Sequence, residues 1–354
     1  MRRMTRRVRV GDVIIGGGAP VVVQGMTKTR TTDVAATVRQ IEQMAREGCR
    51  LVRLAIPDRE AVDALREIRR LSPLPLVADV HFDYRLALAC LDWVDKLRIN
   101  PGNLGGEARL RQVCRAVAQR GIPLRVGVNA GSLERDLLRR HGGPTPEALV
   151  ASALRAARLA EEEGVEQLVL SAKASSAQDT IRAYRLLAEN TEWPLHVGVT
   201  AAGPLFEGLV RSALALGTLL QQGIGDTLRV SLTADPRWEI RAAYWILEAA
   251  GVGGRGVVII SCPTCGRCPS ARVRRLAREV KRRLADLTVA LRVAVMGCAV
   301  NGPGEAREAD VGLALADDGA WLFERGRLIC RVRGGDMVEE LCARARQLAK
   351  SGGG

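Results

Sequence analysis

The chain has 354 residues, and its 53 Lys and Arg outnumber its 39 Asp and Glu, which gives a formal net charge of +14. Hydrophobic residues make up 47% and charged residues 26%, a composition typical of a soluble globular protein that excludes disordered, collagenous and coiled-coil classes. We expect no membrane protein, because no apolar run approaches the roughly 18 residues that span a bilayer. The arginines are spread along the whole chain and only 3% of residues are aromatic, which favours an anionic small molecule over nucleic acid as the partner.

An apolar strand-like run followed by an amphipathic helical run recurs eight times before residue 250. The predicted strands are 20–24, 51–56, 76–80, 96–100, 124–129, 167–172, 195–200 and 227–232. The segments between them show helical spacing, for example over 34–47, 59–71, 147–163 and 236–249. Eight such units predict an α/β fold of the TIM (β/α)8 barrel type, because parallel strands covered on both faces read as short continuous apolar runs. A short hairpin over 8–16 is expected to close the N-terminal end of the barrel.

Polar residues occur at the end of each predicted strand, where a purely structural core would not place them. These residues are Gln24, Thr27, Arg53, Asp79, His81, Arg98, Asn100, Arg125, Asn129, Lys173, Thr200, Arg229 and Ser231. In a barrel they all converge on the C-terminal face, where active sites are built. Because arginine can donate two hydrogen bonds to phosphate and lysine supplies a point charge, the set favours a small substrate with a phosphate or diphosphate.

Four glycines between 251 and 256 break the helical pattern and mark a linker. Beyond it we predict a strand over 257–260, a helix over 272–287, a strand over 291–296, a small antiparallel meander over 310–332 and a closing helix over 337–350. The sequence therefore predicts a barrel domain over 1–250 and a second, smaller α+β domain over 256–354.

Four of the nine cysteines, Cys262, Cys265, Cys268 and Cys298, fall together in the second domain. This clustering, without a signal peptide, indicates a cytoplasmic protein with a metal or redox centre. A structural zinc site needs four nitrogen or sulfur ligands, and this domain has no histidine, so the fourth ligand is either Cys268 or another group. Three cysteines and a different fourth ligand suit a [4Fe-4S] cluster with one chemically distinct iron.

The cysteine strings SCPTC at 261–265 and GCAVNGPGEA at 297–306 resemble the cluster motifs of the 4-hydroxy-3-methylbut-2-en-1-yl diphosphate synthase family, in its bacterial two-domain form. The barrel agrees with this family at QGMT (24–27), ADVHF (78–82), RINPGN (98–103), RVGVNAGS (125–132) and GDTLRVSL (225–232). The resemblance covers nearly the whole chain.

The resemblance implies that Cys262, Cys265, Cys298 and Glu305 hold a [4Fe-4S] cluster, with the carboxylate as the exchangeable ligand. It also implies the reaction, a two-electron reductive ring opening of 2-C-methyl-D-erythritol 2,4-cyclodiphosphate in the methylerythritol phosphate route of isoprenoid biosynthesis. The polar residues at the strand ends are then expected to hold the cyclic diphosphate. A flavodoxin or ferredoxin would supply the electrons to an oxidoreductase that is a head-to-tail homodimer.

The chain departs from the family pattern at 200–203, which reads Thr-Ala-Ala-Gly where the family usually has Thr-Glu-Ala-Gly. Ala201 therefore replaces a glutamate thought to help deliver a proton, a loss worth roughly 10²- to 10⁴-fold in rate unless another acid substitutes. Asp79 and His81 are the candidate acids, alongside the cluster ligand Glu305. Two alternatives stay open: a diverged paralogue that acts on another anionic substrate, and a non-catalytic redox carrier or sensor with Cys268 as its responsive thiol.

Overall fold

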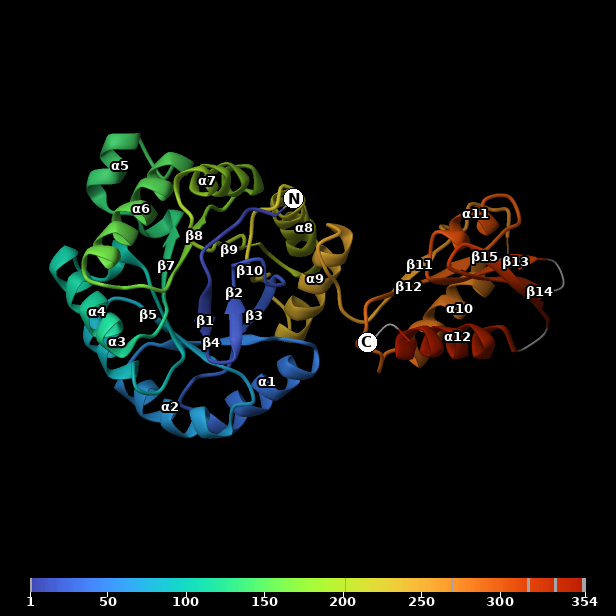
Figure 1. The fold of residues 1–354 in the computed structure, drawn as a ribbon, viewed down its shortest axis with the longest axis horizontal. Coiled ribbons are helices and arrows are strands. Elements are labelled where there is room, and N and C mark those ends of the chain that lie inside the picture. Colours follow the sequence, from blue (N-terminus) through green and yellow to red (C-terminus); the bar gives the residue numbers. More distant parts are fainter. Residues whose placement is uncertain (1, 201, 269, 317–318, 334–335, 352–354) are drawn as a thin grey trace. The chain divides into compact units, whose positions relative to one another are not determined.

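The structure is a computed structural model, and it describes residues 2–200, 202–268, 270–316, 319–333 and 336–351. The chain divides into two compact units, Met1–Gly253 and Gly254–Gly354 (Figure 1). No helix among the described residues has both the length and the apolar character needed to cross a membrane.

The first unit is a barrel of eight parallel strands, as the sequence predicts. The strands are β3 (Val22–Met26), β4 (Leu51–Ile56), β5 (Leu76–Val80), β6 (Lys96–Ile99), β7 (Leu124–Asn129), β8 (Leu168–Lys173), β9 (His196–Val197) and β10 (Thr227–Leu228). Their order is β8-β7-β6-β5-β4-β3-β10-β9, and a parallel bridge between Leu170 and Leu195 joins the two ends of this sheet. The barrel is therefore closed, and its strand ends face a common site.

Strands β9 and β10 are two residues long each, so the predicted strands over 195–200 and 227–232 were too long. Beyond them the pairing continues only through single hydrogen bonds, from Arg229 N to Val197 O (3.1 Å) and from Thr200 N to Ala174 O (3.4 Å). As a consequence, Thr200 and Ser231 lie in loops and not on the sheet.

Helices surround the barrel on its outside (Figure 1). They are α1 (Val34–Arg46), α2 (Arg59–Leu71), α3 (Tyr84–Cys90), α4 (Glu107–Arg120), α5 (Arg135–His141), α6 (Pro146–Glu162), α7 (Ala177–Asn190), α8 (Leu205–Gln221) and α9 (Pro236–Ala249). Most begin at a polar cap; for example, Asp58 accepts a hydrogen bond from Ala61 N (2.8 Å) at the start of α2. Each buries an apolar stripe, which in α2 includes Val62, Leu65 and Ile68.

The predicted N-terminal hairpin is present as β1 (Val8–Val10) and β2 (Val13–Ile15), which pair antiparallel. Its apolar side chains form one buried cluster with Val22, Leu51 and Val77, which lie at the starts of barrel strands. The hairpin therefore covers the N-terminal end of the barrel, and the carboxyl ends of the strands are left for the site.

The second unit is a five-stranded mixed sheet with helices. Strands β11 (Val257–Ser261), β12 (Leu291–Met296) and β13 (Val311–Ala316) are parallel, and β14 (Gly319–Glu324) and β15 (Arg327–Val332) follow antiparallel. The meander is thus confirmed, as one side of a continuous sheet. Helices α10 (Ser270–Arg283) and α12 (Met337–Ser351) pack their apolar residues in the same core, and the short α11 (Gly302–Arg307) was not predicted.

Candidate functional site

Cationic side chains converge inside the barrel from four of its strands and from the loop after β10. They are Arg53, Lys96, Arg98, Arg125, Lys173 and Arg229. The first five are at most 7% exposed, and the side chain of Arg229 is 13% exposed. Since ionisable side chains are seldom buried without partners, so many cations in one interior indicate a site built for an anion.

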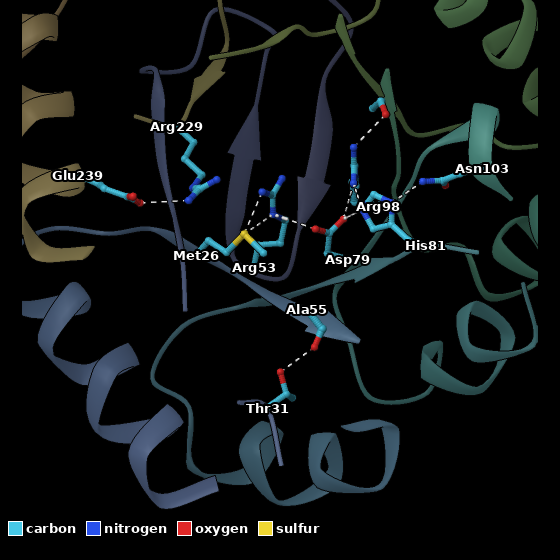
Figure 2. Close-up of polar contacts among 11 residues, drawn as sticks. Met26, Thr31, Arg53, Ala55, Asp79, His81, Arg98, Asn103, Arg229 and Glu239 are labelled. Atoms are coloured by element: carbon cyan, nitrogen blue, oxygen red, sulfur yellow. Dashed lines mark hydrogen bonds and ion pairs between the residues drawn. The ribbon is translucent and has the colours of Figure 1, made fainter. Parts of the chain in front are cut away.

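Asp79 is a carboxylate that lies among these cations (Figure 2). It accepts a hydrogen bond from Arg98 Nη1 (2.7 Å), and its other oxygen lies 3.6 Å from Arg53 Nε. Burial opposes ionisation of Asp79, but Arg53, His81 and Arg98 together hold its pKa well below the ordinary value. Asp79 is therefore a permanent carboxylate that fixes the two guanidinium groups.

Glu239 on α9 is a second carboxylate, and the sequence analysis missed it. It forms ion pairs with Arg229 (3.3 Å) and Lys28 (2.9 Å), and it accepts a hydrogen bond from Leu232 N (2.9 Å). One sequence signal could have identified it, because Glu239 is an acidic residue on the apolar stripe of a predicted helix. Glu239 thus orients Arg229 as Asp79 orients Arg98.

Lys96, Arg125 and Lys173 form no ion pair with a carboxylate among the residues that the structure describes. Lys96 Nζ and Arg125 Nε and Nη1 are buried without a hydrogen-bond partner in the described part of the chain. Burial, followed by the repulsion of neighbouring cations, lowers the pKa of all three side chains well below their ordinary values. A dianionic ligand would relieve both costs at once, because it brings acceptors and opposite charge to the same place.

Two glycines make room for these cations. A Cβ at Gly198 would lie 2.5 Å from Lys173 Nζ, and a Cβ at Gly127 would lie 2.5 Å from Arg98 Nε. The backbone of β7 and of the segment after β9 therefore carries no side chain at the two positions where Arg98 and Lys173 pass over it. This is a cradle that any larger residue would fill.

The amide and hydroxyl residues predicted for the site differ in what they contact. Asn100 accepts a hydrogen bond from Gly102 N (3.1 Å) and donates one to Ser132 Oγ (2.6 Å), so it fixes the turn after β6. The Asn129 amide oxygen, in its better orientation, accepts from Arg98 Nη2 at 3.2 Å. Thr200 and Ser231 are half-buried in the loops after β9 and β10.

His81 lies at the edge of this network, with its side chain 31% exposed. The Asn103 amide lies 2.8 Å from Nδ1, and Nε2 lies 3.4 Å from Asp79 Oδ1 (Figure 2). Arg98 Nη1 lies 2.5 Å from Nε2. Because a guanidinium nitrogen only donates, Nε2 accepts this hydrogen bond, and the proton of the neutral ring resides on Nδ1, where it faces the Asn103 amide. The next residue, Phe82, has a left-handed backbone (φ 62°), a strained conformation of the kind found beside functional groups. Ala201 lies outside the described residues.

The four clustered cysteines lie at the carboxyl ends of β11 and β12 in the second unit. The sulfurs of Cys262 and Cys268 lie on the same side of Gly297, where an added Cβ would meet them at 3.2 and 2.4 Å. The backbone N–H groups of Asn301 and Val300 lower the pKa of the Cys298 thiol, which favours its thiolate. Glu305 is exposed in the first turn of α11.

These donors suit an iron-sulfur cluster in kind, because thiolates are its usual ligands. Burial first, then the proximity of Cys262, Cys298 and Cys265, raises the pKa of Cys268, so all four thiols lie within electrostatic range of one another. In the described residues, no three cysteine, histidine or acidic side chains have converged on a single point that could hold a metal ion. Cys262 and Cys268 thus lie beside Gly297, and the four thiols would need to come closer together to hold a cluster.

Known structures of other proteins share the barrel. A dihydropteroate synthase from Yersinia pestis superposes with a TM-score of 0.51 at 13% identity, covering 69% of this chain and 98% of its own. A spore coat polysaccharide biosynthesis protein from Bacillus subtilis gives 0.51 at 12% identity, covering 70% and 72%. At such low identity these similarities establish the fold alone.

Sequence relatives are far closer. A protein of Geobacter sulfurreducens named 4-hydroxy-3-methylbut-2-en-1-yl diphosphate synthase (flavodoxin) is 49% identical over 98% of this chain and 99% of its own length. A protein of the same name from Symbiobacterium thermophilum is 50% identical over 98% and 94%. The family described as the GcpE TIM-barrel domain matches residues 5–244, and the GcpE protein C-terminal domain matches 258–347. On this sequence similarity and on the barrel with its separate cysteine-bearing unit, the chain belongs to the GcpE family.

Proposed function

We propose that this chain is an oxidoreductase of isoprenoid biosynthesis. It catalyses the reductive ring opening of 2-C-methyl-D-erythritol 2,4-cyclodiphosphate to 4-hydroxy-3-methylbut-2-enyl diphosphate, with electrons from a flavodoxin. Two electrons enter the substrate, and a hydroxyl group takes up a proton and leaves as water. Relatives of about 50% identity over nearly the whole chain carry the name of this synthase. The observation in the structure that carries the proposal is the buried, carboxylate-poor cluster of cations inside the barrel.

The barrel interior holds the cyclic diphosphate. Arg98 and Arg53, fixed by Asp79, and Arg229, fixed by Glu239, present guanidinium groups of set orientation. Arg125, Lys173 and Lys96 contribute further charge near by, and the hydroxyls of Thr200 and Ser231 and the amides of Asn100 and Asn129 border the site. A pre-organised cationic interior of this kind stabilises the diphosphate that ring opening releases as a leaving group.

Cys262, Cys265, Cys298 and Glu305 hold a [4Fe-4S] cluster in the second unit, with Glu305 at the exchangeable position. When bound, the cluster supplies single electrons and a Lewis-acidic iron. The N–H groups around Cys298 favour a thiolate there. Glu305 makes a suitable exchangeable ligand because its carboxylate is exposed and stands in the first turn of a helix. Such thiols stay reduced in the cytoplasm, where we place the enzyme.

His81 delivers the proton in place of the glutamate that Ala201 has replaced. Its ring is partly exposed at the edge of the cationic interior, and its Nε2 lies 3.4 Å from Oδ1 of Asp79, which stays ionised. Asp79 itself is a positioning residue, because its low pKa makes it a poor acid.

The active enzyme is a head-to-tail homodimer, in which the cluster unit of one subunit serves the barrel of the other. Mixing tests this directly. Arg125→Met disables the barrel and Cys298→Ser disables the cluster unit, so each homodimer is inactive. Co-refolded or co-expressed together, the two variants form mixed dimers with one intact site, and activity returns to about a quarter of the wild-type level. Recovery of no activity in a verified mixed dimer contradicts the arrangement.

Anaerobic turnover of the cyclodiphosphate by the iron-loaded chain, with reduced methyl viologen as donor, tests the function. We expect 4-hydroxy-3-methylbut-2-enyl diphosphate to form, and Arg125→Met to abolish it. Arg120→Met is the matched control, because Arg120 is ion-paired to Asp92 on the surface (2.8 Å). A loaded cluster without product, not rescued by Ala201→Glu, favours instead a diverged paralogue with another anionic substrate. A redox carrier is disfavoured by the cationic interior, which a carrier does not need.

A further inference from the structure

The first helix of the second unit, α10, carries an unusual concentration of positive charge. Its 14 residues include seven basic side chains and one acidic side chain, Glu279, which gives a net charge of +6. Several surface arginines of the barrel are paired across elements, as with Arg155 and Asp136 (2.7 Å) or Arg241 and Glu47 (2.6 Å). Helix α10 therefore has too few acidic residues of its own to pair with its basic side chains.

The charge faces solvent on one side of the helix. Val273, Leu276 and Val280 are buried in the core of the second unit, which fixes the inner face of α10. The outer face forms a shallow hollow of about 700 Å³, which we call the α10 basic face, lined by Ala271, Arg274, Arg275, Arg278, Glu279 and Arg282. These positions recur every three or four residues, so they make one continuous stripe.

Two arginines at the centre of the α10 basic face lack a carboxylate partner. Arg275 and Arg278 are exposed, and neither forms an ion pair with any described acidic residue. Glu279 is engaged by Arg283 (2.7 Å) and more weakly by Arg282 (4.0 Å). An exposed guanidinium held free on a rigid helix is available to an acidic surface.

The α10 basic face begins beside the proposed electron-accepting centre. Helix α10 starts at Ser270, two residues after Cys268, and Arg274 and Arg275 stand in its first two turns. A 14-residue helix is about 21 Å long, so the whole stripe lies within the footprint of a small protein. A donor bound there places its redox group near the cysteine loop.

We propose that the α10 basic face is the docking site of the electron donor, a small acidic flavin-carrying protein of the flavodoxin type. The proposal rests on the proposed function, and charge complementarity selects the partner: a rim of carboxylates around the donor's redox group matches the arginine stripe. Attraction between such faces speeds encounter and weakens as salt rises, because the exposed charges are screened within about 10 Å at 0.1 M salt. Docking is transient, because an electron carrier must dissociate after it has delivered its electron.

The double variant Arg275→Glu/Arg278→Glu tests the docking site in the iron-loaded, full-length enzyme. Turnover is measured with reduced flavodoxin and, separately, with reduced methyl viologen, a small cation that needs no docking face. We expect the KM for flavodoxin to rise at least tenfold while the viologen-driven rate stays at the wild-type value. Rising salt should slow the flavodoxin reaction of the wild type and have little effect on that of the variant.

The matched control is Arg139→Glu/Arg140→Glu, which makes the same charge change at two exposed arginines of α5 on the barrel. It should leave the KM for flavodoxin within about twofold of the wild type. An unchanged KM in the α10 variant overturns the proposal, as does an equal rise in the control. Binding of a DNA oligonucleotide at physiological salt, with the flavodoxin KM unchanged, would assign the face to nucleic acid instead. Absence of activity with viologen in every protein would refute the proposed function and not the docking site.

Discussion

Lys96→Met is the substitution that most sharply separates binding from stability in this barrel. Lys96 is fully buried, its Nζ has no hydrogen-bond partner in the described residues, and its pKa is lowered by burial and by the nearby Arg125 and Arg53. A buried polar group without a partner costs about 1–3 kcal/mol. Methionine fills a similar volume without the charge, so the variant should gain about that much free energy of unfolding.

For a unit of this size, 1 kcal/mol shifts the Tm by about 2–4 °C, so the Tm of the ligand-free variant should rise by about 2–12 °C in scanning calorimetry. For ligand binding, the wild type should be the better of the two proteins. Inorganic pyrophosphate should bind the variant about tenfold more weakly, which corresponds to about 1.4 kcal/mol of lost ligand stabilisation.

Lys28→Met is the control for this measurement. The amine of Lys28 is satisfied by Glu239 (2.9 Å) and by Leu232 O (2.6 Å), so its removal should destabilise the chain by about 1–3 kcal/mol. A lower Tm for ligand-free Lys96→Met would refute the reasoning, because it would mean that the buried ammonium is already satisfied without an anion.

The other predictions concern the cradle, the thiols and pH. Gly198→Ala places a Cβ against Lys173 Nζ and should weaken pyrophosphate binding about tenfold in calorimetry, whereas Gly217→Ala, which meets nothing within 4 Å, should not. Cys268→Ser should still load about four irons per chain with an unchanged electron paramagnetic resonance spectrum, as four-iron clusters can be held by three cysteines and another ligand; loss of the cluster would make Cys268 a ligand. Because burial lowers the pKa of Lys173 on folding, the unfolded chain binds more protons between this lowered pKa and 10.5, and the free energy of unfolding should rise with pH through that range. The buried thiols of Cys49, Cys90 and Cys114 have the opposite effect, since folding raises the pKa of each from 9.0 to about 12. Above pH 9 these three thiols outweigh Lys173, so urea titrations should show a free energy of unfolding that falls above about pH 9, and a steady fall from pH 7 would contradict this.

The barrel could be predicted because its strands are covered on both faces, and runs such as Leu76–Val80 and Leu51–Ile56 have the observed bounds. Pattern reasoning failed at β9 and β10, where the apolar run continues but the chain leaves the ladder. An apolar run indicates that a segment is buried, but it does not indicate that the segment pairs in a sheet. A buried loop beside the site can be as apolar as a strand.

The site could be predicted in part. The cations at strand ends were found because their position after an apolar run is readable. Lys96 was not, since it opens its strand, and Glu239 was not, since it comes from a helix. The neighbours that give these residues their roles, Arg125 for Lys96 and Lys28 for Glu239, lie on other elements of the chain. No local pattern encodes such pairs.

Titration calorimetry of 2-C-methyl-D-erythritol 2,4-cyclodiphosphate into the metal-free full-length chain tests the central claim most directly, because it examines the barrel without the cluster. The account predicts one molecule bound per chain, an affinity that falls as salt rises, and at least tenfold weaker binding by Arg125→Met with Arg120→Met unaffected. No binding, or binding that Arg125→Met leaves unchanged, would contradict the assignment of the barrel interior as the substrate site.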